Sequence, residues 1–329
     1  MTPSVGAVGI EGLGFYLPMK VLSNSDLEKM VETTDEWIRT RTGISQRRIA
    51  ADGENTTDLA VAAARHALEY AHLKPTDLDL ILVATMTPAM PCPATSCLVQ
   101  EKLGSPQAAA MDVAAACSGF VYGLVMGQQF IATGTYRHVL VVGAEVLSRV
   151  VDWTDRSTCV LFGDGAGAAI LGRTDQGRIL STYLGSDGSK ADLLKVPSSG
   201  VSDPASRQTV EARGHFLKMN GTEVFKHAVR AMADASLKAI QGAGITPEQV
   251  TCVIPHQANI RIIQAVVERA GIPLEKVYLN VDRYGNMSAA STIVAFCEAV
   301  KEGRLKKGDY ALLVAFGAGL TWGSCIIQW

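Results

Sequence analysis

Three polar residues of this chain have the types and surroundings that nucleophilic acyl chemistry needs, and Cys117 is the first. It lies in the segment Ala114–Phe120, after an apolar strand-like stretch and before a helical pattern. A thiol at the first turn of a helix faces aligned N–H groups, which we expect to lower its pKa and favour the nucleophilic thiolate. The small neighbours leave room for a substrate carbonyl. The alternative is an inert buried residue, because free cysteine packs as a small hydrophobe.

His256 and Asn286 are the other two candidates. His256 follows a predicted strand and Asn286 follows a short polar turn, and a helical pattern begins soon after each. A single histidine in such a place is more often structural than catalytic. However, α/β sheets place their sites in the loops at the carboxyl ends of strands. We therefore expect both side chains to converge on Cys117.

The elements that must position these residues alternate between strands and helices. Short apolar runs predict strands over 78–84, 139–143, 168–171, 251–254 and 311–315. Helical periodicity predicts helices over 57–71, 118–133, 222–241, 260–270 and 289–302. Such alternation indicates an α/β protein with parallel or mixed sheets covered by helices.

An internal repeat organises these elements. Pro75 and Pro247 begin similar segments 172 residues apart, and the runs that start at His138 and Tyr310 match at the same offset. Two matches at one offset predict duplicated halves, residues 1–173 and 174–329, that form one integrated unit. The same offset places Cys117 close to the equivalent of Asn286, so a pocket between the halves is the expected site.

Composition excludes several classes of protein. The 329 residues are 48% hydrophobic and only 19% charged, against ~25% in an average soluble protein. Intrinsic disorder needs the opposite balance. The net charge of −2 indicates no basic surface for nucleic acid. The low charge fraction also raises the question of a large buried subunit interface.

The ends and the cysteines give three further expectations. The first ten residues carry no basic stretch, so we expect no secretory signal. No apolar run reaches the ~18 residues of a transmembrane span. The seven cysteines form no C-x-x-C pair and no zinc-type spacing, which favours free thiols in a reducing cytoplasm and no metal site.

Two glycine-rich segments need interpretation. Residues 162–168 lack the G-x-G-x-x-G spacing of a dinucleotide loop, so close backbone packing is the better prediction. Residues 316–323 follow a predicted strand. They can offer a backbone N–H to an oxyanion or serve only as a tight turn.

Together these segments resemble β-ketoacyl-acyl-carrier-protein synthase III, the initiating condensing enzyme of bacterial type II fatty-acid synthesis. The resemblance covers nearly the whole chain and is carried by residues 34–43, 114–120, 155–158, 162–167, 255–261, 286–291 and 316–319. It implies a thiolase-like α/β fold of five layers, α-β-α-β-α, from two duplicated halves. It also implies a homodimer with a large interface, which would account for the low charge fraction. The order Cys, His, Asn also differs from the Cys-His-His set of elongating condensing enzymes and from hydroxymethylglutaryl-CoA synthase-like enzymes, which add a glutamate.

The resemblance implies a role for each polar residue. Cys117 would take an acyl group from acyl-CoA, which is a substrate, so no cofactor is implied. His256 and Asn286 would hold the thioester oxygen of malonyl-acyl carrier protein during decarboxylation. The backbone N–H groups of Cys117 and Ala318 would form the oxyanion hole.

The substrate sites carry over in the same way. The coenzyme A set is Trp37, Arg41, Arg156, Met219, Gly221, Phe225, Ala258 and Asn259, with Trp37 and Arg156 resembling an adenine sandwich. The acyl pocket is Cys92, Leu147, Leu217 and Phe316, and the carrier-protein rim is Lys226 and Arg261 unless these two are ordinary surface. Residues 89–93, which include Cys92, resemble the loop that reaches across the dimer into the partner's acyl pocket. Short-chain members of the family often carry Phe at the position of Cys92. A smaller side chain predicts room for longer or branched acyl groups.

Three other functions fit part of the pattern. A cysteine hydrolase of papain type also has Cys, His and Asn in this order, but it leaves the repeat unexplained. A non-catalytic acyl-binding protein would have no need of all three groups. Condensing enzymes of secondary metabolism share the motifs, so the sequence separates them poorly from fatty-acid initiation.

Overall fold

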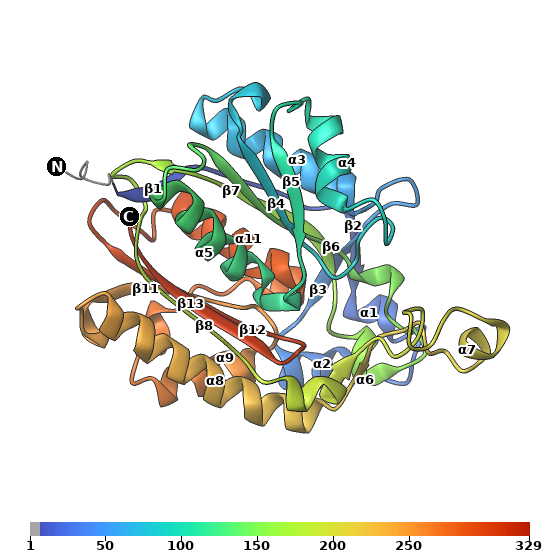
Figure 1. Cartoon of the computed structure of the whole chain (residues 1–329). Coiled ribbons are helices and arrows are strands. Elements are labelled where there is room, and N and C mark those ends of the chain that lie inside the picture. The colour runs from blue at the N-terminus through green and yellow to red at the C-terminus, as the bar shows by residue number, and fades with distance from the viewer. Residues whose placement is uncertain (1–6) are drawn as a thin grey trace.

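Two β-sheets and three layers of helices alternate through the molecule (Figure 1). The computed structural model describes residues 7–329, so residues 1–6, on which the expectation about a secretory signal partly rests, lie outside the described chain. The layer order is α-β-α-β-α, as the resemblance implies. Within residues 7–329, no helix is both long and apolar enough to span a bilayer.

The first sheet has five strands. Their spatial order is β1 (Val8–Tyr16), β7 (Asp164–Arg173), β6 (Val139–Val146), β4 (Leu80–Ala84) and β5 (Ala109–Val113). β4 runs parallel to β5 and β6, whereas β7 runs antiparallel to β6 and β1. Every residue of β4 and β6 is buried, because helices cover both faces of the sheet. Continuous apolar runs are the expected sequence of such strands.

The second sheet repeats this arrangement with four strands. Their order is β11 (Val250–Pro255), β12 (Tyr310–Gly317), β13 (Thr321–Gln328) and β8 (Arg178–Ser186). β11 and β12 are parallel, and β13 runs antiparallel to both of its neighbours. The five strands predicted from the sequence are therefore confirmed, although the structure extends four of them and begins β4 two residues later. Sequence reasoning missed β1, β8 and β13.

The topology supports the proposal of two duplicated halves. All strands of the first sheet lie within residues 8–173, and all strands of the second lie within 178–328. The order β1-β7-β6-β4 matches β8-β13-β12-β11. The 3-10 turns Pro75–Asp77 and Pro247–Gln249 begin at the prolines that the repeat aligns and precede β4 and β11.

Three pairs of helices form the other layers. α3 (Thr56–Ala71) and α4 (Thr95–Leu103) cover the outer face of the first sheet, and α8 (Gly221–Gly242) and α9 (Ile260–Arg269) cover that of the second (Figure 1). α5 (Gly119–Ala132) and α11 (Ala289–Lys301) lie between the sheets. The five predicted helices are confirmed, each end within one residue.

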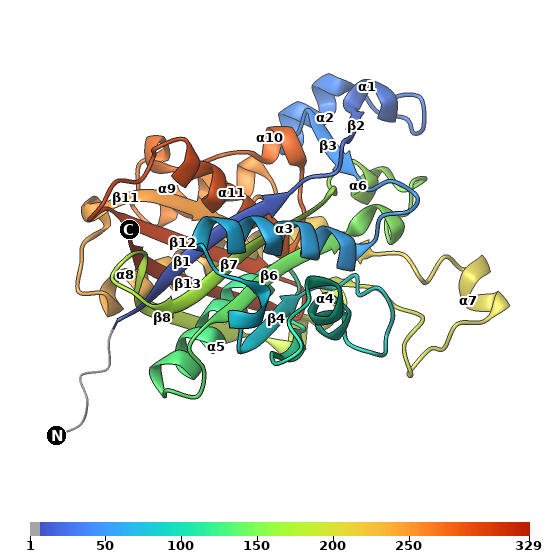
Figure 2. The ribbon, with the colours of Figure 1, turned by 90° about the horizontal axis from the view of Figure 1, so that it is seen from above.

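Shorter elements complete the chain around one end of the sheets (Figure 2). They are β2 (Lys20–Ser23), α1 (Asn24–Leu27), α2 (Asp35–Thr42), β3 (Gln46–Ile49), α6 (Arg156–Cys159), β9 (Leu194–Lys195), α7 (Arg207–Glu211), β10 (Lys218–Met219) and α10 (Val281–Tyr284). In both views the segment around α7 projects from the body, and Val201 there is 99% exposed. This agrees with the polar, irregular composition of the segment.

The glycine-rich segment 162–168 serves close packing. A Cβ on Gly165 would lie 2.6 Å from the Met287 sulfur, and one on Gly167 would lie 2.6 Å from Ile293 Cγ2. Both glycines belong to β7, and their missing side chains let α11 and the turn before it approach the sheet. The preference for packing over nucleotide binding is therefore confirmed.

Candidate active site

The candidate nucleophile lies on a strained turn between β5 and α5. Cys117 is the middle residue of the 3-10 turn Ala116–Ser118, and Ala116 has a φ of +46°. Ser118 Oγ donates to Ala115 O and contacts Thr321 Oγ1, both at 2.7 Å, and Thr321 Oγ1 lies 3.0 Å from the same carbonyl. These bonds tie the turn to the start of β13. Strained backbone held by its surroundings is common at functional sites.

The expected direction of the Cys117 pKa was wrong. Burial raises the pKa of the Cys117 thiol to about 12, and the residue is only 7% exposed. Loss of hydration penalises the thiolate, and this cost outweighs the favourable effect expected from the adjoining helix. The free enzyme therefore holds a neutral thiol, and the proton must leave Cys117 as a substrate reacts.

His256 is a neutral, buried imidazole. It directly follows β11, and its backbone N–H donates to Val314 O of β12 at 2.7 Å. Burial lowers the pKa of His256 to about 4. Nδ1 is buried without a hydrogen-bond partner among residues 7–329. Such an imidazole can donate one hydrogen bond at neutral pH but carries no mobile extra proton.

Asn286 is held in a defined orientation by its own turn. Its Oδ1 accepts the backbone N–H of Ser288 at 2.8 Å, and its backbone N–H donates to Leu161 O at 2.8 Å. Only an oxygen can accept from a backbone N–H, so this contact fixes which way the amide faces. The Nδ2 group therefore remains available as a donor.

One cavity brings the three candidate residues together, as the sequence predicts. Its empty volume, which includes some open solvent, is about 890 Å³, and Cys117, His256 and Asn286 all line it. The expected oxyanion donor Ala318 lines it as well. A Cβ on Gly317, the residue before it, would lie 2.7 Å from the Cys117 backbone nitrogen, so the end of β12 directly adjoins the nucleophile turn.

The same cavity collects most of the expected substrate residues. Its wall contains the five residues expected to contact pantetheine, which are Met219, Gly221, Phe225, Ala258 and Asn259, and two of the acyl-pocket set, which are Leu217 and Phe316. Leu147 is fully buried in the hydrophobic cluster that contains Leu217, but it does not line the cavity. Cys92 lies on an exposed loop away from it.

Trp37 and Arg156 contact each other directly. The guanidinium carbon of Arg156 lies 4.8 Å from the centre of the Trp37 ring, and Arg156 Nη1 donates to Glu32 O at 2.9 Å. This is a cation–π contact, and the spacing leaves no room for a ring between the two side chains. A base could enter between them only if Arg156 moved. Arg41 is exposed on α2, and its carbonyl accepts from Asn259 Nδ2 at 3.1 Å.

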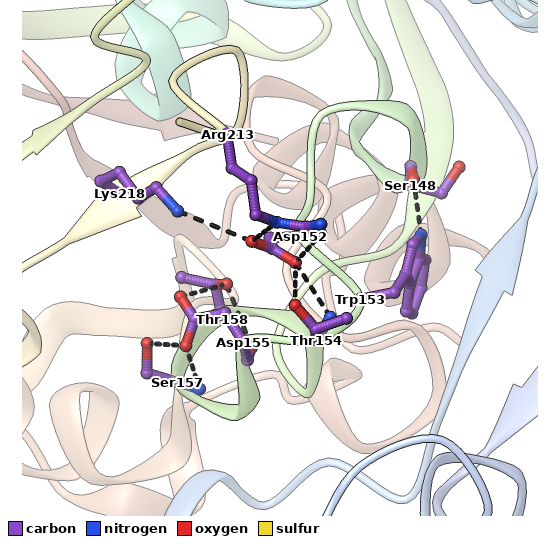
Figure 3. Close-up of polar contacts among 9 residues, drawn as sticks. All are labelled: Ser148, Asp152, Trp153, Thr154, Asp155, Ser157, Thr158, Arg213 and Lys218. Carbon is purple, nitrogen blue, oxygen red and sulfur yellow. Dashed lines mark hydrogen bonds and ion pairs between the residues drawn. The ribbon is translucent and has the colours of Figure 1, made fainter. Parts of the chain in front are cut away.

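The buried Asp152 carboxylate connects the segment that leads to α6 and Arg156 with the segment that contains Arg213 and Lys218 (Figure 3). It accepts hydrogen bonds from Arg213 Nε at 2.7 Å and from Thr154 Oγ1 at 2.7 Å, and Lys218 Nζ lies 3.6 Å away. The bond from Arg213 holds the pKa of Asp152 well below its usual range. Lys218 precedes Met219 of the cavity wall and Thr154 adjoins α6 with Arg156. We call this set of contacts the Asp152 clamp.

Glu145 is a second buried carboxylate that sequence reasoning missed. It accepts the backbone N–H groups of Met86 and Thr87 at 3.1 Å each, and burial raises its pKa to about 7. Met86 lines the cavity. Glu145 thus fixes the loop after β4. The only sequence signal was an acidic residue within an otherwise apolar strand.

The two expected carrier-protein residues lie at the surface. Lys226 pairs with Glu223 one turn earlier in α8 at 2.7 Å, and the Arg261 guanidinium lies 5.9 Å from the Phe225 ring. Both side chains are exposed, and Phe225 belongs to the cavity wall. The two cations therefore lie near one side of the cavity.

Comparisons with known proteins agree along nearly the whole chain. The family model described as 3-oxoacyl-[acyl-carrier-protein (ACP)] synthase III matches residues 111–188, and its C-terminal counterpart matches 240–329. The β-ketoacyl-[acyl-carrier-protein] synthase III of Caldanaerobacter subterraneus subsp. tengcongensis is 55% identical over 98% of both chains.

Two solved structures extend the comparison to the fold. The 3-oxoacyl-[acyl-carrier-protein] synthase III of Aquifex aeolicus VF5 is 49% identical, with a TM-score of 0.90 over 98% of this chain and 100% of that one. The priming β-ketosynthase of the R1128 polyketide pathway is 37% identical, with a TM-score of 0.91 over 99% and 97%. These matches confirm the thiolase-like fold and leave the cysteine hydrolase without support. The chain belongs to the β-ketoacyl-acyl-carrier-protein synthase III family.

Proposed function

We propose that this chain catalyses the decarboxylative condensation of an acyl-CoA with malonyl-acyl carrier protein and so initiates fatty-acid synthesis. The observation that carries the proposal is the single cavity. It joins a cysteine, a neutral histidine and an oriented asparagine amide to a largely apolar wall that suits a pantetheine arm. Family membership supplies the class of enzyme, an acyltransferase that forms a carbon–carbon bond.

In the first step Cys117 Sγ attacks the thioester carbonyl of acyl-CoA. The new carbon–sulfur bond forms as the bond to the CoA sulfur breaks, and the cysteine proton ends on the CoA thiol. The oxyanion of the intermediate would accept the backbone N–H groups of Cys117 and Ala318. Exchange between two thioesters is nearly balanced in energy, so the main task of the site is to stabilise this intermediate.

In the second step malonyl-acyl carrier protein loses carbon dioxide. The electrons of the broken bond form an enolate, whose oxygen would accept hydrogen bonds from His256 and the Asn286 Nδ2 group. The enolate carbon then attacks the acyl carbonyl, and the Cys117 thiolate leaves and takes a proton from solvent. The pKa of about 4 matters because a charged imidazolium would donate its proton to the carbanion and end the reaction.

We also propose that the enzyme is a homodimer joined at the edge of the first sheet. β5 pairs only with β4 within the described chain, and its outer side exposes apolar Met111. Cys92 and Met90 are exposed on the loop after β4. An exposed apolar edge strand readily pairs with a second copy. The dimer would account for the low charge fraction and would let Cys92 reach the partner's acyl pocket.

The remaining partners follow from this function. The exposed cations Lys226 and Arg261 would receive the acidic carrier protein at the rim of the cavity. Trp37, Arg41 and Arg156 would hold the nucleotide end of coenzyme A, with Arg156 moving off the indole. The chemistry requires no cofactor and no metal. All seven cysteines, which lie within residues 7–329, are free thiols, which favours a cytoplasmic location.

Intact-mass spectrometry after mixing with acyl-CoA tests the proposed function. We expect one acyl adduct per chain with acetyl-, isobutyryl- or octanoyl-CoA, and none in Cys117→Ala. An adduct that persists in Cys117→Ala would contradict the assignment of the nucleophile. Sedimentation tests the dimer, which has a mass of about 70 kDa, twice the 34.9 kDa of one chain. A species of 34.9 kDa at micromolar concentration would contradict it.

A further inference from the structure

Gln257 is a fully buried amide beside the catalytic histidine that the reaction described above does not use. Its Nε2 donates to Pro255 O at 2.9 Å and to Tyr278 O at 3.1 Å. Its Oε1 accepts from Asn280 N at 3.1 Å and from Val281 N at 3.2 Å. The amide thus uses both donors and both acceptor positions, and all four partners are backbone atoms.

These four bonds connect the two segments that carry the proposed electrophiles. Pro255 ends β11 immediately before His256, and Tyr278–Val281 leads through α10 to Asn286. Regular strand pairing does not make this connection. Among residues 7–329 the segment pairs with β11 only at an isolated bridge between Val253 and Val277, where Tyr278 N–H donates to Val253 O at 2.9 Å. The Gln257 side chain therefore takes the place of sheet hydrogen bonds between the histidine loop and the asparagine segment.

The asparagine segment is also held from its other side. Glu298 of α11 accepts from Asn280 Nδ2 at 2.9 Å, from Tyr284 Oη at 2.7 Å and from Arg283 Nη2 at 3.1 Å. Asn280 is thus held through its backbone by Gln257 and through its side chain by Glu298. Glu298 thus fixes the start of the segment to α11, and backbone bonds to Leu161 and Gly163 fix its end at Asn286. The bonds of Gln257 join the segment to the histidine loop.

The nucleophile turn is held by a different set of bonds. Its hydrogen bonds run among Ala115, Ser118 and Thr321, and the Cys117 thiol also contacts Ser288 beside Asn286. Within residues 7–329 no hydrogen bond joins the turn to Gln257. We propose that Gln257 is a positioning residue that fixes the separation of the His256 imidazole from the Asn286 amide. It would thereby serve the decarboxylative condensation and not the acylation of Cys117.

The physical reason is geometric. Two donors that share one enolate oxygen must both lie within hydrogen-bonding distance of it. A misplacement of about 1 Å can cost about 10²-fold in rate. Acylation requires only Cys117 and the oxyanion hole. The inference rests on the proposed function, because it assigns Gln257 to one of its two half-reactions.

The test compares these half-reactions in Gln257→Met, which keeps the length of the side chain and removes its hydrogen bonds. Gln128→Met is the matched control, since Gln128 Nε2 donates to Ile179 O at 3.1 Å at the far end of α5. Acylation by acetyl-CoA is followed by intact mass, and the pre-acylated enzyme is then mixed with malonyl-acyl carrier protein. A second variant, Gln257→Asn, keeps the amide and shortens the side chain by one methylene group, in case the methionine variant does not fold.

We expect acylation near the wild-type rate in both Gln257 variants and condensation slower by about 10²-fold in Gln257→Met, with Gln257→Asn less affected. The control should retain both rates. Equal losses in the two half-reactions, or an unchanged condensation rate, would overturn the inference. If the wild-type chain itself forms no adduct or no condensation product, the proposed function fails instead, so the two failures are distinguishable.

Discussion

The substitution Gly317→Ala places a methyl group against the backbone of the nucleophile turn. The added Cβ would lie 2.7 Å from Cys117 N, 3.1 Å from Ser118 N and 3.2 Å from Ala115 O. These are backbone atoms, so no flexible side chain can move aside. Either the turn or the end of β12 must shift. The backbone N–H groups of Cys117 and Ala318, which we propose as the oxyanion donors, would then no longer converge on one oxygen.

The expected loss follows from the two donors involved. Removing one oxyanion donor costs about 10²–10³ in rate, and overpacking a buried site typically costs about 1–3 kcal/mol of stability. We therefore expect Gly317→Ala to fold, to melt at a lower temperature, and to lose about 10²-fold in both half-reactions. This differs from the Gln257 variants, in which only condensation should fall.

Rapid-quench acylation by acetyl-CoA, read by intact mass, measures the effect, and thermal unfolding reports stability. Gly53→Ala is the matched control, because a Cβ there meets no atom within 4 Å. A Gly317→Ala enzyme that acylates at the wild-type rate would refute the placement of the oxyanion hole between β12 and the nucleophile turn.

Four further predictions concern other parts of the site. Asp152→Asn weakens the Asp152 clamp, so steady-state kinetics should give a several-fold higher KM for acyl-CoA with little change in kcat. An unchanged KM would contradict a role of the clamp in binding acyl-CoA. Because the pKa of His256 is about 4, condensation by the acyl-enzyme should have no inflection near pH 6.5. Since the unfolded chain binds this proton near pH 6.5, the His256 contribution to the free energy of unfolding should fall by about 3 kcal/mol as the pH drops from 7 to 4. The raised pKa of Glu145 contributes a gain over the same range, so the effect is read as the difference between the wild type and His256→Asn. Cys92→Phe should favour acetyl-CoA over isobutyryl-CoA in competition assays if the loop reaches the partner, and an unchanged ratio would contradict this.

The elements around the site were predictable because their signals are local. Strands β4 and β11 each follow a turn that begins with proline. Helices α5 and α11 have clear helical periodicity and each follow a run of small residues. The repeat then placed Cys117 and Asn286 at near-equivalent positions. Missed strands such as β13 have mixed sequences, and only pairing with β12 and β8 makes them strands.

What sequence reasoning missed depends on contacts that no local pattern encodes. Asp152 and Arg213 are 61 residues apart in irregular segments, and Gln257 binds only backbone atoms. The helix that follows Cys117 was visible in the sequence, whereas the degree of burial was not. For this reason the expected pKa direction was wrong.

The central claim is that one site acylates Cys117 and then forms a carbon–carbon bond by decarboxylation. The most direct measurement mixes the chain with acetyl-CoA and malonyl-acyl carrier protein labelled with ¹³C at the free carboxylate. The account predicts release of ¹³CO₂ together with unlabelled acetoacetyl-acyl carrier protein, and no such product from Cys117→Ala. Hydrolysis of the malonyl thioester without a condensed product, or equal product from Cys117→Ala, would contradict it.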